Sequence, residues 1–388
     1  MALDLNFTAA ESQFRTEVRE WMALHVPREP LPSLEGKAGF QLHRAWEKTL
    51  AAGNWGMITW PREYGGRGAT LIEWLIFEEE YYRANAPLRV NQNGVFLLGP
   101  TLMEFGSQAQ KARFLPKMAA GEEIWAQAWS EPQAGSDLAA LRSTATRDGD
   151  GYRLRGHKIW SSRATFGDWC FGIFRTDAAS ERHVGLTFFL IPLDHPGVRV
   201  RGIRQIHGEP GFAEIFFEDA LVPLEWRLGE EGQGWNIAMA TAGFERGLML
   251  RSPARFQVAA AHLVKLYERQ AATAEPGLAS AVAQAFMDAE AYALATYSTA
   301  CRLRAGGRIG VEGSLNKIFW SELDVQLHRC AMSLLGAYAE LASDDPAVIG
   351  HDAWLDGFLF SLAGPIYAGT NEVQRNIISE RLLGLPRS

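Results

Sequence analysis

The order of three periodicities constrains the fold of this chain more than any other feature of its sequence. Helical patterns fill most of residues 6–121, short β-type runs broken by Gly, Asp and Pro follow up to residue 234, and long helical patterns return after it. This order predicts a mainly α protein with a middle β-barrel or sandwich. The expected domains are an N-terminal helical domain (1–121), a middle β domain (122–234) and a C-terminal helical bundle (235–388).

Several local signals refine these expectations. Thr8 followed by Glu11 has the spacing of a capping box, so a helix is expected to begin there. The letters DGDG at residues 148–151 predict the turn of a β-hairpin. The acidic run at 78–80 is interpreted as a solvated helix face, and His207 as a turn residue.

Composition excludes some classes of function. The net charge of −7 gives the chain no broad attraction for nucleic acid or for an anionic membrane. Cys170, Cys301 and Cys330 lie far apart, which suits the reducing cytoplasm and predicts neither disulfides nor a structural metal. The first 21 residues have no apolar core of a signal peptide. No GxGxxG motif indicates a Rossmann nucleotide site.

One segment carries chemical information, namely WSEPQAGSDLAALRSTA at residues 129–145. It has the pattern of a strand that ends in a tight turn, with Ser136 and Asp137 at the exit. Gly135 would let backbone approach a ligand, and successive turn amides can bind an anion. The same pattern also fits an ordinary strand-to-turn connection.

This segment and six others resemble sequence motifs of the acyl-CoA dehydrogenase family. They occur along the chain in the same order as in the family. SEPQAGSD resembles the family's [T/S]EPxAGSD signature, and the others are WPREYGGRG, FGSQAQKARFLPKMAAGE, DGDGYRLRGHKIWSS, FAEIFFEDALVP, LGEEGQGW and GTNEVQRNIISERLLG. The resemblance implies a helical N-terminal domain, a β domain and a C-terminal four-helix bundle. It also implies FAD as the cofactor, an acyl-CoA thioester as the substrate and an electron-transfer flavoprotein as the electron acceptor.

The resemblance assigns flavin contacts to four short segments. These residues are Ala128, Trp129 and Ser130 at the ring, Gly135 and Ser136 near the pyrophosphate and CoA, Trp160, Ser161 and Ser162 beside the ring and N5, and Thr370 with Glu372 at the start of a helix. Ser162 stands where Thr is commoner and keeps the hydroxyl. Thr370 would serve equally as a plain N-cap.

The catalytic base is expected away from its commonest position in the family. Many members use the Glu of an IYEGT motif, but this chain reads IYAGT, and Ala368 cannot accept a proton. Isovaleryl- and long-chain-type members use a Glu that precedes an Arg, which Glu245 and Arg246 match in TAGFERG. The resemblance therefore implies Glu245 as the base and Arg246 as a CoA contact. The alternative is a surface acid paired with a cation.

Two family elements that complete the flavin site across a subunit interface are missing. The RxxFGxP segment is replaced by LYERQAATAEPGLAS, where Arg269 is a loose substitute, and the QxxGGxG loop by LLGAYAELASDDP. The assembly is therefore expected to be a homodimer, a homotetramer or an α2β2 heterotetramer. Alternatives to the dehydrogenase are a half-site or non-catalytic subunit and a flavin oxidase or monooxygenase of the same fold. The sequence does not set acyl chain length or branching.

Overall fold

The computed structural model describes residues 6–245, 252–270, 274–307, 310–341 and 354–386. The chain forms two compact units. Unit 1 consists of the described residues within 1–24, 70–86 and 246–388, and unit 2 consists of residues 25–69 and 87–245. The domain boundaries at 121 and 234 stay predictions.

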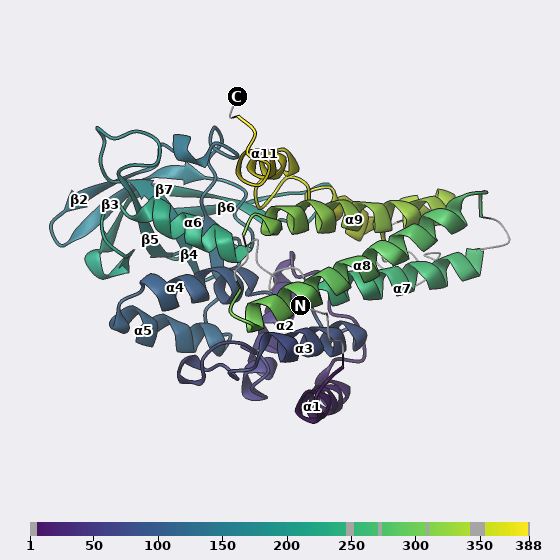
Figure 1. The fold of residues 1–388 in the computed structure, drawn as a ribbon. Coiled ribbons are helices and arrows are strands. Elements are labelled where there is room, and N and C mark those ends of the chain that lie inside the picture. Colours follow the sequence, from purple (N-terminus) through teal and green to yellow (C-terminus); the bar gives the residue numbers. More distant parts are fainter. Residues whose placement is uncertain (1–5, 246–251, 271–273, 308–309, 342–353, 387–388) are drawn as a thin grey trace. The chain divides into compact units, whose positions relative to one another are not determined.

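Unit 2 is built on a β sheet, of which strands β2 to β7 are labelled in Figure 1. The sheet has eight strands with the order β6-β7-β3-β2-β4-β5-β8, and β1 pairs with β4. The strands are β1 (Trp125–Ala128), β2 (Thr144–Asp148), β3 (Gly151–Lys158), β4 (Trp169–Arg175), β5 (Leu186–Pro192), β6 (Val198–Ile203), β7 (Phe212–Pro223) and β8 (Arg227–Leu228). The β2–β3 pair is antiparallel and turns at residues 149–150, which confirms the predicted hairpin. The buried core of the whole sheet includes Leu154, Phe174 and Ile215.

Unit 2 also contains helices, some of which pack on the sheet and on one another. They are α2 (Lys37–Ala52), η1 (Arg62–Tyr64), η2 (Asn93–Leu98), α4 (Gly99–Phe105), α5 (Gln108–Ala119), η3 (Leu138–Ala140), η4 (Leu224–Trp226) and α6 (Gly234–Glu245). Helix α6 packs on β5 and β4. The buried hydroxyls of Thr101 in α4 and Thr241 in α6 lie 2.9 Å apart and fix these two helices together. The helical stretch at 93–105 was not predicted from the sequence.

Unit 1 is helical. It contains α1 (Ala9–His25), α3 (Leu71–Arg83), α7 (Pro253–Gln270), α8 (Leu278–Arg304), α9 (Glu312–Leu335), η6 (Gly336–Glu340), α10 (Trp354–Ser361) and α11 (Asn371–Arg381). Helices α7, α8 and α9 run side by side around a core that includes Phe256, Leu263 and Leu327 (Figure 1). The capping box of Thr8 and Glu11 is present at the start of α1, as predicted. None of the described helices combines the length and hydropathy needed to cross a lipid bilayer.

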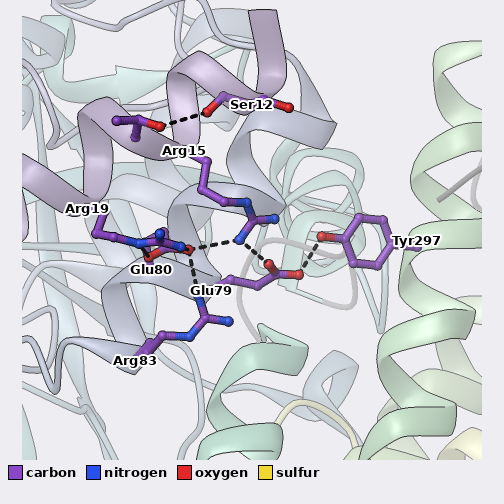
Figure 2. A network of polar contacts seen from close by, with 8 residues as sticks. Ser12, Arg15, Arg19, Glu79, Glu80, Arg83 and Tyr297 are labelled. Carbon is purple, nitrogen blue, oxygen red and sulfur yellow. Dashed lines mark hydrogen bonds and ion pairs between the residues drawn. The ribbon is translucent and has the colours of Figure 1, made fainter. Parts of the chain in front are cut away.

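In the acidic run of α3, Glu78 and Glu80 are buried and Glu79 is partly buried, so its interpretation as a solvated face was wrong. The Glu80 side chain is 2% exposed and accepts hydrogen bonds from Arg15 and Arg19 of α1 and from Arg83 (Figure 2). Glu79 binds Arg15 and accepts a hydrogen bond from the Tyr297 hydroxyl of α8. The guanidinium groups replace the water that a buried carboxylate loses, which is why an acid can lie between helices here.

Candidate active site

The first segment with predicted flavin contacts follows β1. Ala128 is buried and pairs with Gly172 of β4. The Trp129 ring is also buried and packs edge-on against Phe171 and Phe188, at centroid distances of 6.3 and 6.4 Å. The indole of Trp129 is therefore part of the core. The backbone of this segment and the partly exposed Ser130 are what remain for a ligand.

The turn after this segment is open on its outer side. Gly135 and Ser136 are exposed, and a Cβ added at Gly135 would meet no heavy atom of the described residues within 4 Å. The packing of unit 2 therefore does not require a glycine at this position. A ligand that approaches the backbone closely would require one.

The second segment, Trp160–Ser162, follows β3 and has an unusual conformation. Trp160 has a φ of +61°, which L residues adopt rarely, and its side chain is 58% exposed. Ser161 exchanges two backbone hydrogen bonds with Ala213, at 3.0 and 3.1 Å. The Ser161 hydroxyl is buried and has no hydrogen-bond partner among the described residues. Ser162 is partly exposed.

These features suit the binding of a flat, partly polar group such as a flavin. The exposed Trp160 indole and the open turn at Gly135 are accessible to such a ligand, whereas the Ser161 hydroxyl is covered by the protein itself. Two hydrogen bonds connect the segment after β1 to the segment after β3. Ile159 N donates to Ser130 O at 2.9 Å, and Lys158 Nζ donates to Trp129 O at 3.2 Å. The residues present in unit 2 therefore fit FAD.

The remaining predicted flavin contacts lie in unit 1. Thr370 is the N-cap of α11, and its hydroxyl accepts a hydrogen bond from Val373 N at 3.2 Å. The N-cap role is thus confirmed, and the FAD contact stays a prediction. Glu372 is exposed in the first turn of α11. A hydrogen bond from its own backbone N–H and another from the Thr370 hydroxyl lower the pKa of Glu372.

Ala368 lies in the turn that leads into α11. It has a φ of +57°, and Gly369 follows with +78°. Gln374 Nε2 donates to the carbonyls of both residues, at 3.3 and 3.2 Å, and so holds the turn against the helix. The turn is partly exposed, and position 368 carries no carboxylate.

The predicted base lies at the end of α6. Glu245 is the last residue of that helix, and Arg246 lies outside the described residues. Sequence reasoning placed His207 in a turn, and it lies in the turn between β6 and β7 with Nε2 2.8 Å from Glu35 Oε2.

Sequence reasoning missed two residues near the site, Lys158 and Glu131. Both belong to the quoted motifs, at the end of β3 and at the start of the SEPQAGSD turn. The signal that was available is a lysine at the end of a strand pattern of buried residues, where a charge requires a partner.

Comparisons with known proteins agree with this architecture. Models of the N-terminal, middle and C-terminal domains of acyl-CoA dehydrogenases match residues 8–122, 126–220 and 232–383. The acyl-CoA dehydrogenase IpdE1 of Mycobacterium tuberculosis is 40% identical over 97% of this chain and 98% of the relative.

Two solved structures are also similar to this chain. One is described as the Tcur3481-Tcur3483 steroid ACAD, with a TM-score of 0.87 and 26% identity over 99% of this chain and 100% of that one. The other is the ChsE4-ChsE5 complex from Mycobacterium tuberculosis, with a TM-score of 0.85 and 30% identity. The match covers 99% of this chain and 100% of that one. The three-domain fold, the full-length match and the fit of unit 2 to a flavin lead to one conclusion: this chain belongs to the acyl-CoA dehydrogenase family and is an FAD-dependent enzyme.

Proposed function

We propose that the protein introduces an α,β double bond into an acyl-CoA thioester, with Glu245 as the base that removes the α proton. The observation that supports this proposal is the connection of residues 128–136 to residues 160–162 by the Ile159–Ser130 and Lys158–Trp129 hydrogen bonds, next to the exposed ring of Trp160. A site that presents an indole and the partly exposed Ser162 can hold a flavin ring and shield it from water.

Bound FAD supplies an acceptor for the hydride that leaves the β carbon. The protein's own part is to position and to accept a proton. The exposed ring of Trp160 would cover one side of the flavin, and the Ser162 hydroxyl would bond near N5. The amides of the turn at Gly135 and Ser136 would bind phosphate groups of the ligands, and Arg246 would bind the CoA portion.

The choice of Glu245 rests on elimination and on the sequence around it. Ala368 removes the commoner base, so a carboxylate must come from another element. Helix α6 is rich in apolar residues, and Ile237, Ala238 and Ala242 are buried. In the sequence, apolar residues flank Glu245 on both sides, and from this pattern we expect a setting with little water, which suits a general base.

The substrate we propose to test first is a steroid-derived acyl-CoA thioester. The support is the description of one similar structure as a steroid ACAD, at 26% identity over nearly the whole chain. Straight-chain, branched and cyclic thioesters are the alternatives. A single methylene changes binding by only about 1–3 kcal/mol, so the test must compare whole classes of acyl group.

A second candidate concerns assembly. We propose that the chain works as one subunit of an α2β2 complex, with a homodimer or homotetramer as the alternative. The support is the absence of the RxxFGxP and QxxGGxG elements from the sequence, together with a similar structure that is described as the ChsE4-ChsE5 complex. An electron-transfer flavoprotein would accept the electrons. From the cysteine pattern, we expect the cytoplasm as the location.

The experiment is an anaerobic titration of the FAD-loaded protein with a panel of acyl-CoA thioesters, on a sample whose native mass and FAD content per chain are measured. Bleaching of the flavin by one class, with slow reoxidation by oxygen, is the expected result. Rapid reoxidation by oxygen would instead indicate an oxidase. An absence of bleaching by every thioester would reject the dehydrogenase proposal for the isolated chain, and recovery with a partner subunit would establish the α2β2 assembly.

A further inference from the structure

Lys158 and Glu131 are two buried charges that the proposed chemistry does not use. The Lys158 side chain is 0% exposed and that of Glu131 is 3% exposed, and Nζ lies 2.8 Å from Oε1. A buried ion pair adds little to stability on average, because each charge loses its hydration. What the pair holds in place is therefore of interest.

Lys158 joins three parts of the sheet. Besides Glu131, its ammonium group donates to Trp129 O at 3.2 Å and to Ile173 O of β4 at 2.9 Å. All three of its donors are thus used. Because Lys158 ends β3, two residues before Trp160, these bonds fix the start of the 160–162 segment relative to the segment after β1.

Glu131 closes the turn that carries Gly135 and Ser136. Its Oε1 accepts from Ser143 N at 2.9 Å, and its Oε2 accepts from Arg142 N at 2.7 Å. Gln133 Nε2 also donates to Oε2 at 2.7 Å. The carboxylate therefore connects the two ends of the exposed turn, and Lys158 connects that carboxylate to the other flavin segment.

Glu131 stays ionised at neutral pH. Burial alone would raise the pKa of its carboxyl, but the charge of Lys158 and hydrogen bonds from Lys158 and from the 142–143 backbone outweigh burial and lower the pKa to about 2. The carboxylate is thus a permanent acceptor for all its donors.

We propose that Lys158 and Glu131 are positioning residues that set the spacing between the two flavin-binding segments, 128–136 and 160–162. The inference rests on the proposed function, because it assumes that FAD binds to these segments. It goes beyond that function in making FAD affinity depend on a pair of side chains buried beneath the site.

The test separates positioning from simple stability through three variants. Glu131→Asp keeps the charge but shortens the side chain by one methylene. Glu131→Gln alone leaves Lys158 without its counter-charge. Glu131→Gln combined with Lys158→Met removes both charges, and such a double change often restores stability. The matched control is Arg199→Met with Glu218→Gln, an exposed ion pair at 2.9 Å between β6 and β7 of the same sheet.

For each protein, urea unfolding of the apoprotein and the FAD dissociation constant are measured, together with visible circular dichroism of the bound flavin. We expect the double variant to unfold near the wild-type urea concentration. Its FAD dissociation constant should rise about tenfold, the change expected for one or two misplaced hydrogen bonds. Glu131→Asp should also raise the FAD dissociation constant, and the visible circular dichroism spectrum of its bound flavin should differ from that of the wild type.

A double variant and a Glu131→Asp variant that both bind FAD within twofold of wild type would overturn the proposal. Should the double variant fail to fold, Glu131→Asp alone decides. If a thioester bleaches the flavin of the wild type and the variants bind FAD normally, the positioning role is rejected and the proposed function stands. Failure of the wild type to bind FAD would reject both.

Discussion

Two buried glutamates, Glu131 in unit 2 and Glu80 in unit 1, solve the same electrostatic problem in different ways. Glu131 meets one buried cation, Lys158, and backbone N–H groups of an irregular turn. Glu80 meets three guanidinium groups, of which those of Arg19 and Arg83 are about 60% exposed (Figure 2). The first pair is sealed within the sheet, and the second cluster borders water.

This difference indicates different roles. The bonds of Glu131 shape a turn that no regular hydrogen-bond ladder holds, so its loss should alter the geometry of the predicted flavin site. The bonds of Glu80 join α1 to α3, and Glu79 extends them to Tyr297 of α8. Packing of these helices also fixes their places, so the loss of Glu80 should lower stability without moving the site.

The largest expected effect is that of Glu131→Gln. It leaves the fully buried Lys158 ammonium without a counter-charge, and we expect the free energy of unfolding to fall by about 3–5 kcal/mol. Urea unfolding of the apoprotein measures this loss. Glu218→Gln, in an exposed pair of the same sheet, is the control and should change stability by less than about 1 kcal/mol. Equal losses in the two variants would contradict the distinction between sealed and exposed charges.

Glu80→Gln should cost less, about 2 kcal/mol, because Arg19 and Arg83 can return to water when the carboxylate is lost. FAD affinity should stay within twofold of wild type. The same urea and FAD titrations measure both quantities. A marked loss of FAD affinity in this variant would break the comparison, since it would give the α1–α3 cluster a part in the site.

Acid should weaken both clusters, and Glu131 gives the sharper window. Its folded-state pKa of about 2 lies below the ordinary value of 4.5, so its contribution is complete above about pH 4.5 and is lost as the pH falls toward 2. Urea midpoints measured between pH 6 and pH 3 should therefore fall more steeply in wild type than in Glu131→Gln. Parallel curves would show that this carboxyl does not titrate differently on unfolding.

The smallest effect concerns two threonine caps, one in the predicted site and one outside it. Thr370 caps α11 and Thr8 caps α1, and replacing either by Val should cost about 1 kcal/mol. FAD affinity should fall only for Thr370→Val. Titration of both variants with FAD measures this difference. Equal affinity in both variants would reduce Thr370 to a plain cap.

The sequence predicted the order of the fold because helical and strand periodicities record which faces are buried. The Thr8 capping box and the 148–151 hairpin followed from local residues alone. Burial of the acidic run at Glu80 did not, since its partners Arg15 and Arg19 lie some sixty residues earlier and no local pattern records that distance. Lys158 and Glu131 were within the quoted motifs, but their pairing depends on how β1 and β2 pair with β4 and how β3 pairs with β2.

The central claim is that Glu245 removes the α proton of an acyl-CoA thioester, and anaerobic stopped-flow reduction of Glu245→Gln tests it most directly. The substitution keeps the shape and hydrogen bonding of the side chain, so FAD should still bind. The rate of flavin reduction by the best thioester should fall by about 10²–10⁴-fold, the usual contribution of a general base. Glu275→Gln, an exposed acid in unit 1, is the control and should reduce at the wild-type rate. Adding Ala368→Glu to Glu245→Gln should restore part of the rate if position 368 faces the α carbon. Near wild-type flavin reduction by Glu245→Gln would contradict the account and remove Glu245 from the mechanism.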